Sequence, residues 1–116
     1  MPSHKMDKIN EGMRREMSQI VREAKDPRVS SGLVTITRCE VSGDLKFAKI
    51  YYSVLDGDFE NVKKGFISAK GYIRREIAER LNLRNTPELN FISDHSMENA
   101  AKITQILSEM EFGGDE

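Results

Sequence analysis

The sequence has a single cysteine, Cys39, in 116 residues, so it can form no internal disulfide and no cysteine cluster for zinc or an iron–sulfur centre. Its two histidines, His4 and His95, are far apart, and neither has the i, i+4 partner of a helical metal site. No apolar run reaches the roughly 18 residues that a membrane-spanning helix needs. The N-terminal residues lack the apolar segment of a secretory signal. We therefore expect a cytoplasmic protein with no metal, no cofactor and no membrane partner.

The sequence also lacks a recognisable catalytic arrangement. Lys70 and Gly71 are not preceded by the glycines of a phosphate-binding loop. Asp94, His95 and Ser96 are the residue types of a hydrolase triad, but side chains in adjacent positions cannot converge as nucleophile, base and orienting acid. Ser96 is better explained as the cap of a helix. We expect no enzyme activity.

The chain has no large excess of charge of one sign, but its charges are segregated along the sequence. The formal net charge of -1 and the pI near 6.2 argue, taken alone, against a nucleic-acid binder. Residues 62–85, however, carry seven Lys/Arg against two acids, whereas residues 86–116 carry one against seven. Such a chain can dock on phosphate through one basic face while its acidic end stays away. With 38% hydrophobic residues, we expect one domain over residues 1–116.

The stretch from residue 62 to residue 83 has the pattern of an amphipathic helix with a break inside it. Apolar residues recur at helical spacing in both halves: Phe59, Val62, Phe66 and Ala69, then Ile73, Ile77 and Leu81. Gly71 costs about 1 kcal/mol relative to alanine in a helix and can adopt a positive φ. We therefore expect an interhelical kink at Ala69, Lys70 and Gly71. The start of a second helix would expose unpaired N–H groups, which favour an anion such as phosphate.

The bases around this kink are candidate RNA-binding residues: Lys63, Lys64, Lys70, Arg74 and Arg75. The pattern fits a helix-turn-helix edge that holds a nucleic-acid backbone. It also fits a packed helix hairpin with a solvated charged face, since charged outer faces are common.

A second basic line is predicted on the first helix, which should run from about Ser3 to Ala24. Lys8, Arg15 and Arg22 follow one another at seven-residue spacing, nearly opposite the apolar stripe. This line is a second candidate surface for phosphate, and a plain solvated face is the alternative. Asp26 and Pro27 end the helix, and residues 29–32 should form a short loop.

Two strands, at residues 33–41 and 47–55, are predicted to pair as an antiparallel hairpin around a turn at residues 42–44. Alternation places Lys49 and Tyr51 on the same sheet face, where they could contact RNA or simply cover the sheet. Asp58 should cap the next helix. A short third strand is expected at residues 89–92, and a final helix should begin at Ser96 and run to about residue 110.

The element order predicts an α+β fold, a two-layer sandwich of a three-stranded sheet with helices on one face, in the order α-β-β-α-(kink)-α-β-α. This order resembles a type-II KH domain, although the Gly-x-x-Gly loop with which KH domains clamp single-stranded nucleic acid is replaced here by Ala69-Lys70-Gly71. The chain resembles the bacterial ribosome-binding factor A family over nearly its whole length. The motifs that carry this resemblance are Ala69-Lys70-Gly71, Lys25–Val29, Val41–Tyr51, and Pro87–Leu89 followed by Asp94–Ser96.

The resemblance implies a non-catalytic assembly factor of the small ribosomal subunit that acts as a monomer. Members of the family bind the immature subunit and assist late maturation near the 5′ end of the small-subunit rRNA. They support growth in the cold and are released with the help of an assembly GTPase. The rival interpretation is a protein-binding adaptor that acts through the acidic final helix, with Glu98, Glu109 and Glu111 as its contacts.

Overall fold

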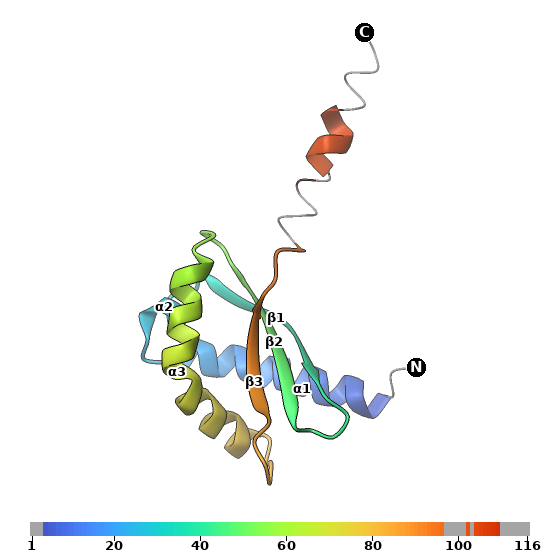
Figure 1. Ribbon diagram of the computed structural model, residues 1–116, viewed down its shortest axis with the longest axis vertical. Coiled ribbons are helices and arrows are strands. Elements are labelled where there is room, and N and C mark those ends of the chain that lie inside the picture. Colours follow the sequence, from blue (N-terminus) through green and yellow to red (C-terminus); the bar gives the residue numbers. More distant parts are fainter. Residues whose placement is uncertain (1–3, 97–101, 103, 110–116) are drawn as a thin grey trace.

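The computed structural model describes residues 4–96, 102 and 104–109 (Figure 1). Its elements are α1 (His4–Glu23), α2 (Pro27–Ser30), β1 (Val34–Val41), β2 (Phe47–Val54), α3 (Phe59–Arg80) and β3 (Glu88–Ser93). The sheet has the order β1-β2-β3, with β1 antiparallel and β3 parallel to the central strand β2. In Figure 1, α1 passes behind the strands. No helix in the described part of the chain is long and apolar enough to cross a membrane.

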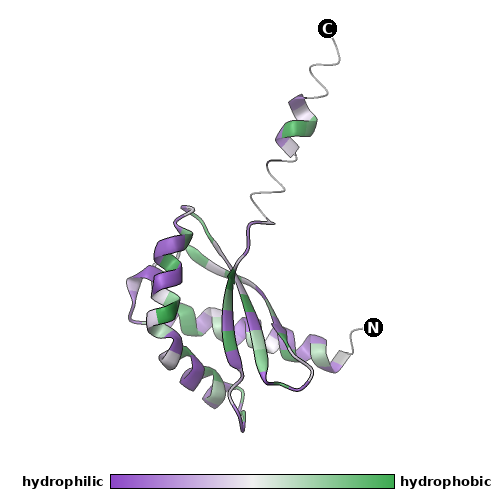
Figure 2. Cartoon of the chain, viewed as in Figure 1, coloured by the Kyte–Doolittle hydropathy of each residue, from purple (hydrophilic) through white to green (hydrophobic). Residues whose placement is uncertain are grey.

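The α+β fold and both strands of the hairpin are confirmed. Along β2, the side chains at alternate positions are buried, from Ala48 to Val54, while Phe47 on the other face is 60% exposed. Figure 2 shows hydrophobic and hydrophilic positions interleaved along the strands. Met17 from α1 and Phe66 from α3 are fully buried in the core that covers this face of the sheet. The helices therefore cover one face of the sheet, as the alternation predicts.

The predicted loop at residues 29–32 is partly wrong, because a short helix, α2, occupies Pro27–Ser30. Asp26 is its N-cap and accepts a hydrogen bond from the backbone N–H of Arg28 at 3.0 Å. Proline is favoured at the first position of a helix because its missing N–H would have no intrahelical partner there. The same Asp26-Pro27 pair therefore ends α1 and begins α2.

The predicted break at Ala69, Lys70 and Gly71 is wrong, because α3 is continuous from Phe59 to Arg80. The glycines with positive φ in the described chain are Gly32 and Gly57, so Gly71 keeps a helical backbone. The cost of about 1 kcal/mol for glycine in the helix is smaller than the free energy gained by burying Phe66 and Ile73, which lie on either side of Gly71 along the helix. Figure 1 shows instead that the axis of α3 changes direction partway along.

Gly65 is the glycine of α3 at which α2 approaches the helix closely, and the sequence pattern did not predict this role. It lies on the buried side of α3 against α2, where an added Cβ would come within 2.8 Å of Arg28 Cβ and 2.9 Å of Val29 Cγ1. Around Gly71, in contrast, nothing lies within 4 Å of such a Cβ. The contact between α2 and α3 therefore depends on glycine at position 65.

Two further predictions concern the ends of this fold. The third strand is confirmed and is slightly longer than predicted, at Glu88–Ser93. The predicted final helix falls partly outside the described residues, and those of its residues that are described, Ser96, Lys102 and 104–109, are helical. Cys39 is buried in the sheet, where burial raises the pKa of its thiol to about 12. This makes it an unreactive core residue.

Candidate nucleic-acid interface

Helix α3 carries three exposed bases, Lys63, Lys64 and Arg75, which we call the basic stripe. All three residues are exposed, and Lys64 and Arg75 lie opposite the buried Phe66 and Ile73 at helical spacing. Among the ion pairs of the described residues, none involves these three side chains. None of these three bases is therefore held in an ion pair within the described residues, and the exposed carboxylates of Glu60 and Glu79 lie one helical turn from Lys64 and Arg75.

Lys70 and Arg74, two other predicted RNA-binding residues, contact an acidic side chain. Lys70 Nζ lies 2.5 Å from Glu88 Oε1, and Arg74 Nη1 lies 3.9 Å from Glu88 Oε2. Arg74 Nη2 also donates to the carbonyl oxygen of Thr86 at 3.3 Å. The hydrogen bond from Lys70 holds the pKa of the Glu88 carboxyl below its usual value. These two bases therefore fasten α3 to the beginning of β3, and their charge is partly neutralised.

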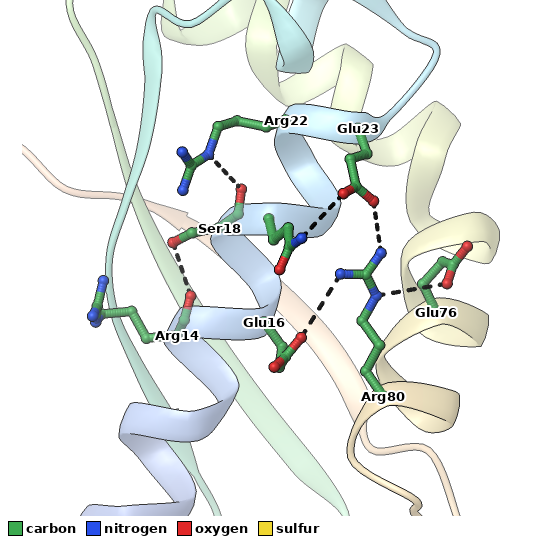
Figure 3. Close-up of polar contacts among 8 residues, drawn as sticks. Arg14, Glu16, Ser18, Arg22, Glu23, Glu76 and Arg80 are labelled. Carbon is green, nitrogen blue, oxygen red and sulfur yellow. Dashed lines mark hydrogen bonds and ion pairs between the residues drawn. The ribbon is translucent and has the colours of Figure 1, made fainter.

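The bases of α1 flank a groove between α1 and the edge strand β1. A cavity of about 440 Å³ is lined by Arg14, Arg15, Ser18 and Arg22 from α1 and by residues 32 and 34–36. In Figure 3, Arg14 and Arg22 extend to the same side of α1. The structure thus brings together the predicted Arg15 and Arg22, whereas Lys8 is exposed and does not line this cavity.

A network centred on Arg80 lies between α1 and α3 (Figure 3). The Arg80 guanidinium is 2.7 Å from Glu23 Oε2 and 3.7 Å from both Glu16 Oε2 and Glu76 Oε2. The hydrogen bond from Arg80 lowers the pKa of the Glu23 carboxyl. Because this acidic cluster intervenes, the predicted bases form two surfaces, one on α3 and one on α1.

The segment predicted as a kink faces the corner between α1 and α2. Ala69 is partly buried against the core, while Gly71 is exposed. A cavity of about 360 Å³ lies beside this segment, lined by Ser68, Ala69 and Tyr72 of α3 and by residues 23–26. The Lys25–Val29 and Ala69–Gly71 motifs are therefore close in space.

On the open face of the sheet, where Lys49 and Tyr51 are predicted, Tyr51 also forms a cation–π pair with Arg38. The guanidinium carbon of Arg38 lies 4.1 Å from the centroid of the Tyr51 ring, and Arg38 Nη1 lies 3.3 Å from Glu40 Oε1. Because Glu40 also pairs in register with Lys49, the acid offsets both bases on this face. The balance of charge favours the two helical surfaces over the sheet for binding phosphate.

Asp94, His95 and Ser96 form no triad. The Ser96 hydroxyl donates to Asp94 Oδ1 at 2.5 Å, and the His95 ring packs on Phe59 with centroids 4.1 Å apart. Asp94 Oδ2 accepts a bond from Thr37, which occupies a bulge of β1, at 2.6 Å. These bonds, first from Ser96 and then from Thr37, lower the pKa of Asp94 to about 2. The described residues contain no cluster of three or more His, Cys, Asp or Glu that could hold a metal.

Asp94→Asn is expected to lower the free energy of unfolding by about 1 kcal/mol at pH 6, because an amide reproduces only part of these bonds. The folded pKa of Asp94 is depressed, so its contribution is complete above about pH 4, the unfolded value, and is lost as the pH falls towards 2. Urea unfolding of both proteins at pH 6 and pH 2.5 measures the difference, which should shrink at the lower pH. An equal difference at both values would show that the carboxylate charge is not responsible.

Arg14 and Ser18 are the groove residues that the sequence pattern did not select. Arg14 forms an i, i+3 ion pair with Glu11, and the Ser18 hydroxyl donates to the Arg14 carbonyl oxygen at 2.8 Å. Both lie on the flank of α1 between its apolar stripe and its line of bases. Only the packing of β1 against this flank makes them part of a cavity.

Comparison with known proteins agrees with this architecture. The profile of the family described as Ribosome-binding factor A matches residues 5–107. The ribosome-binding factor A of Caldicellulosiruptor saccharolyticus is 40% identical over 120 residues, which cover 100% of this chain and 89% of the relative. The crystal structure of ribosome-binding factor A from Thermus thermophilus has a TM-score of 0.68 at 19% identity, covering 76% of this chain and 94% of that one.

A second similar structure is a homology model of the Thermus thermophilus ribosome-binding factor A, fitted into a cryo-EM map of its 30S complex. Its TM-score is 0.64 at 19% identity, and the match covers 82% of this chain and 97% of that one. At this identity the structural likeness shows the fold, while the family profile and the 40% identical relative show the family. The chain belongs to the ribosome-binding factor A family.

Proposed function

We propose that this protein is a non-catalytic assembly factor that binds the immature small ribosomal subunit and assists late maturation of the 5′ end region of its rRNA. The observation that carries the proposal is the basic stripe, Lys63, Lys64 and Arg75, whose exposed side chains form no ion pair within the described residues of a chain of this family. A relative of the same fold has been fitted into a 30S complex. A cluster of unpaired cations on a helix face suits the phosphate backbone of rRNA.

In this proposal, the basic stripe and the bases of α1 contact rRNA phosphates, and the shape of the rRNA supplies the positioning. Lys70 and Arg74 act mainly by fixing α3 against β3 through Glu88. The change of direction along α3 (Figure 1) sets the direction of the stripe. The protein acts as a cytoplasmic monomer, supports growth in the cold, and leaves the subunit with the help of an assembly GTPase.

Co-sedimentation with purified small subunits, immature and mature, tests the proposal. We expect the protein to bind immature subunits more tightly than mature ones, and to lose this binding as salt is raised, because phosphate contacts release counterions. The Lys63/Lys64/Arg75→Ala variant should bind weakly. A matched variant, Lys46/Arg84/Lys102→Ala, removes three exposed bases that lie outside both basic surfaces and should bind like the parent. Failure of the parent to bind either particle would refute the proposal.

A protein-binding adaptor is the second candidate function, and one observation favours it. In the helical residues 104–109, Ile106 and Leu107 are 49% and 58% exposed next to acidic residues. An adaptor of this kind would bind a ribosomal protein or GTPase after nuclease treatment, and its binding would depend on Glu98, Glu109 or Glu111. Loss of all binding on nuclease treatment would exclude this candidate.

A further inference from the structure

The groove between α1 and β1 collects positive charge without a carboxylate in its lining. Three arginines, Arg14, Arg15 and Arg22, line the 440 Å³ cavity together with Ser18 and a short segment that leads into β1. Guanidinium groups of like charge repel one another, and the repulsion is strongest where solvent is restricted. A bound anion would remove this repulsion.

Two of the three arginines, Arg15 and Arg22, form no ion pair within the described residues, although, after the hydrogen bond from Arg14, the charge of Arg15 helps to lower the pKa of Glu11. Arg14 is held by Glu11, with its Nε 3.0 Å from Oε2 of that carboxylate. Within the part of the chain that the structure describes, no carboxylate lies within ion-pair distance of Arg15 or Arg22. Arg22 Nε makes one long bond, 3.4 Å, to the carbonyl oxygen of Ser18, and its guanidinium otherwise extends away from the helix (Figure 3). The donor forks of Arg15 and Arg22 therefore remain available for an anion.

The edge of β1 adds a backbone donor to the same groove. The N–H of Leu55 donates to the carbonyl oxygen of Leu33 at 2.8 Å, which fixes the hydrogen-bonding phase of the hairpin. In an antiparallel pair, alternate residues direct both backbone groups away from the partner strand. The backbone N–H and C=O groups of Val34, which lines the cavity, therefore point away from β2 and towards the groove. The same alternation, resumed after the bulge, directs Val41 outward, and its N–H indeed bonds to Asn10 Oδ1 of α1 at 2.8 Å.

We infer that this groove is a phosphate-binding site, in which Arg15 and Arg22 hold a phosphate of single-stranded RNA with help from Arg14 and the Val34 N–H. Planar guanidinium groups bind phosphate oxygens in a bidentate manner, and backbone N–H groups complete such sites. The inference rests on the proposed function and deepens it, because it assigns the α1 bases to a defined site on the rRNA backbone.

An acidic peptide that adds as a strand to β1 is the other occupant with suitable charge, and the geometry disfavours it. Strand addition needs a continuous open edge, since it depends on a ladder of backbone hydrogen bonds. Ile36 is only 3% exposed, and Asn10 already occupies the N–H of Val41. A phosphate needs donors at one point only, and the groove offers them beside Val34.

The test is an NMR titration of the full chain with inorganic phosphate, with hexauridylate RNA and with hexaglutamate. Phosphate and RNA are expected to shift the amides of Gly32 and Val34 and the Nε–H signals of Arg15 and Arg22. Arg15→Gln/Arg22→Gln should weaken binding of the RNA about 10-fold at 0.1 M salt. The matched variant, Lys46→Gln/Arg84→Gln, removes two exposed bases outside the groove and should bind like the parent.

The alternative outcomes distinguish failure of this inference from failure of the proposed function. Shifts confined to the basic stripe of α3, or equal weakening by both double variants, would show that the groove is not a site. Larger groove shifts with hexaglutamate than with RNA would assign it to an acidic peptide. If the Arg15/Arg22 variant still co-sediments with immature subunits like the parent while the basic-stripe variant does not, the groove assignment fails and the proposed function stands. If phosphate and RNA shift the groove signals but the protein binds no subunit, the groove assignment stands and the proposed function fails.

Discussion

Gly65→Ala is expected to lower the free energy of unfolding by about 2 kcal/mol, although alanine is the better helix former by about 1 kcal/mol. The added Cβ would lie 2.8 Å from Arg28 Cβ and 2.9 Å from Val29 Cγ1. Neither atom can move easily, because Val29 is 1% exposed and the Arg28 side chain is held by Asp26 at 2.7 Å. Either α2 must shift from α3 or the core must rearrange, and both cost stability.

Urea unfolding of the parent, Gly65→Ala and Gly71→Ala measures this effect with a matched control. Gly71→Ala should raise the free energy of unfolding, by up to about 1 kcal/mol, since the helix is continuous there and the space for a Cβ is empty. The two variants make the same chemical change in the same helix and should shift the urea midpoint in opposite directions. Destabilisation by Gly71→Ala as large as that by Gly65→Ala would mean that the bend in α3 requires glycine at position 71.

Replacement of the basic stripe, Lys63/Lys64/Arg75→Ala, is expected to weaken binding to immature subunits on the order of 100-fold at 0.1 M salt. The log–log dependence of the affinity on salt should flatten by about 2 to 3, since each phosphate contact contributes about 0.7 to 0.9 to the slope. Stability should change little, because the three side chains are exposed and form no ion pair within the described residues.

Lys70→Ala/Arg74→Ala provides the comparison. These bases contact Glu88, so their removal should reduce stability and flatten the salt dependence less than removal of the basic stripe. Binding curves over a salt series, measured beside urea unfolding for both variants, separate the two effects. A parental slope for the basic-stripe variant would remove Lys63, Lys64 and Arg75 from the set of rRNA contacts.

Regular periodicity made most of the fold predictable. The second strand was predicted to within one residue because Ala48, Ile50, Tyr52 and Val54 alternate strictly with their neighbours on the other face, which is the pattern of a strand with one buried face. The first helix follows in the same way from its apolar stripe. The β1 bulge was not predicted, although the spacing from Ile36 to Cys39 is three where alternation requires two. That change of phase is the sequence signal of the extra residue.

The candidate site was less predictable, because it depends on contacts between distant segments. Nothing local distinguishes Lys70 and Arg74 from Lys63 and Lys64; the difference is Glu88, which β3 brings beside the first pair. Gly65 and Gly71 likewise have the same intrinsic propensity, and only the approach of α2 makes one of them necessary. Propensity alone favoured a break at Gly71, but helix packing on both sides overrode it.

The parallel pairing of β3 with β2 has a consequence for the order of folding. β1 and β2 are joined by a short turn, so their hairpin can form locally within microseconds. β3 can join only after α3 has crossed the sheet, and the bond from Thr37 to Asp94 closes a separation of 57 residues. During synthesis one edge of β2 therefore stays unpaired until residues 88–93 emerge. In that interval the newborn chain exposes an open strand, and the docking of α3 is the event that allows it to close.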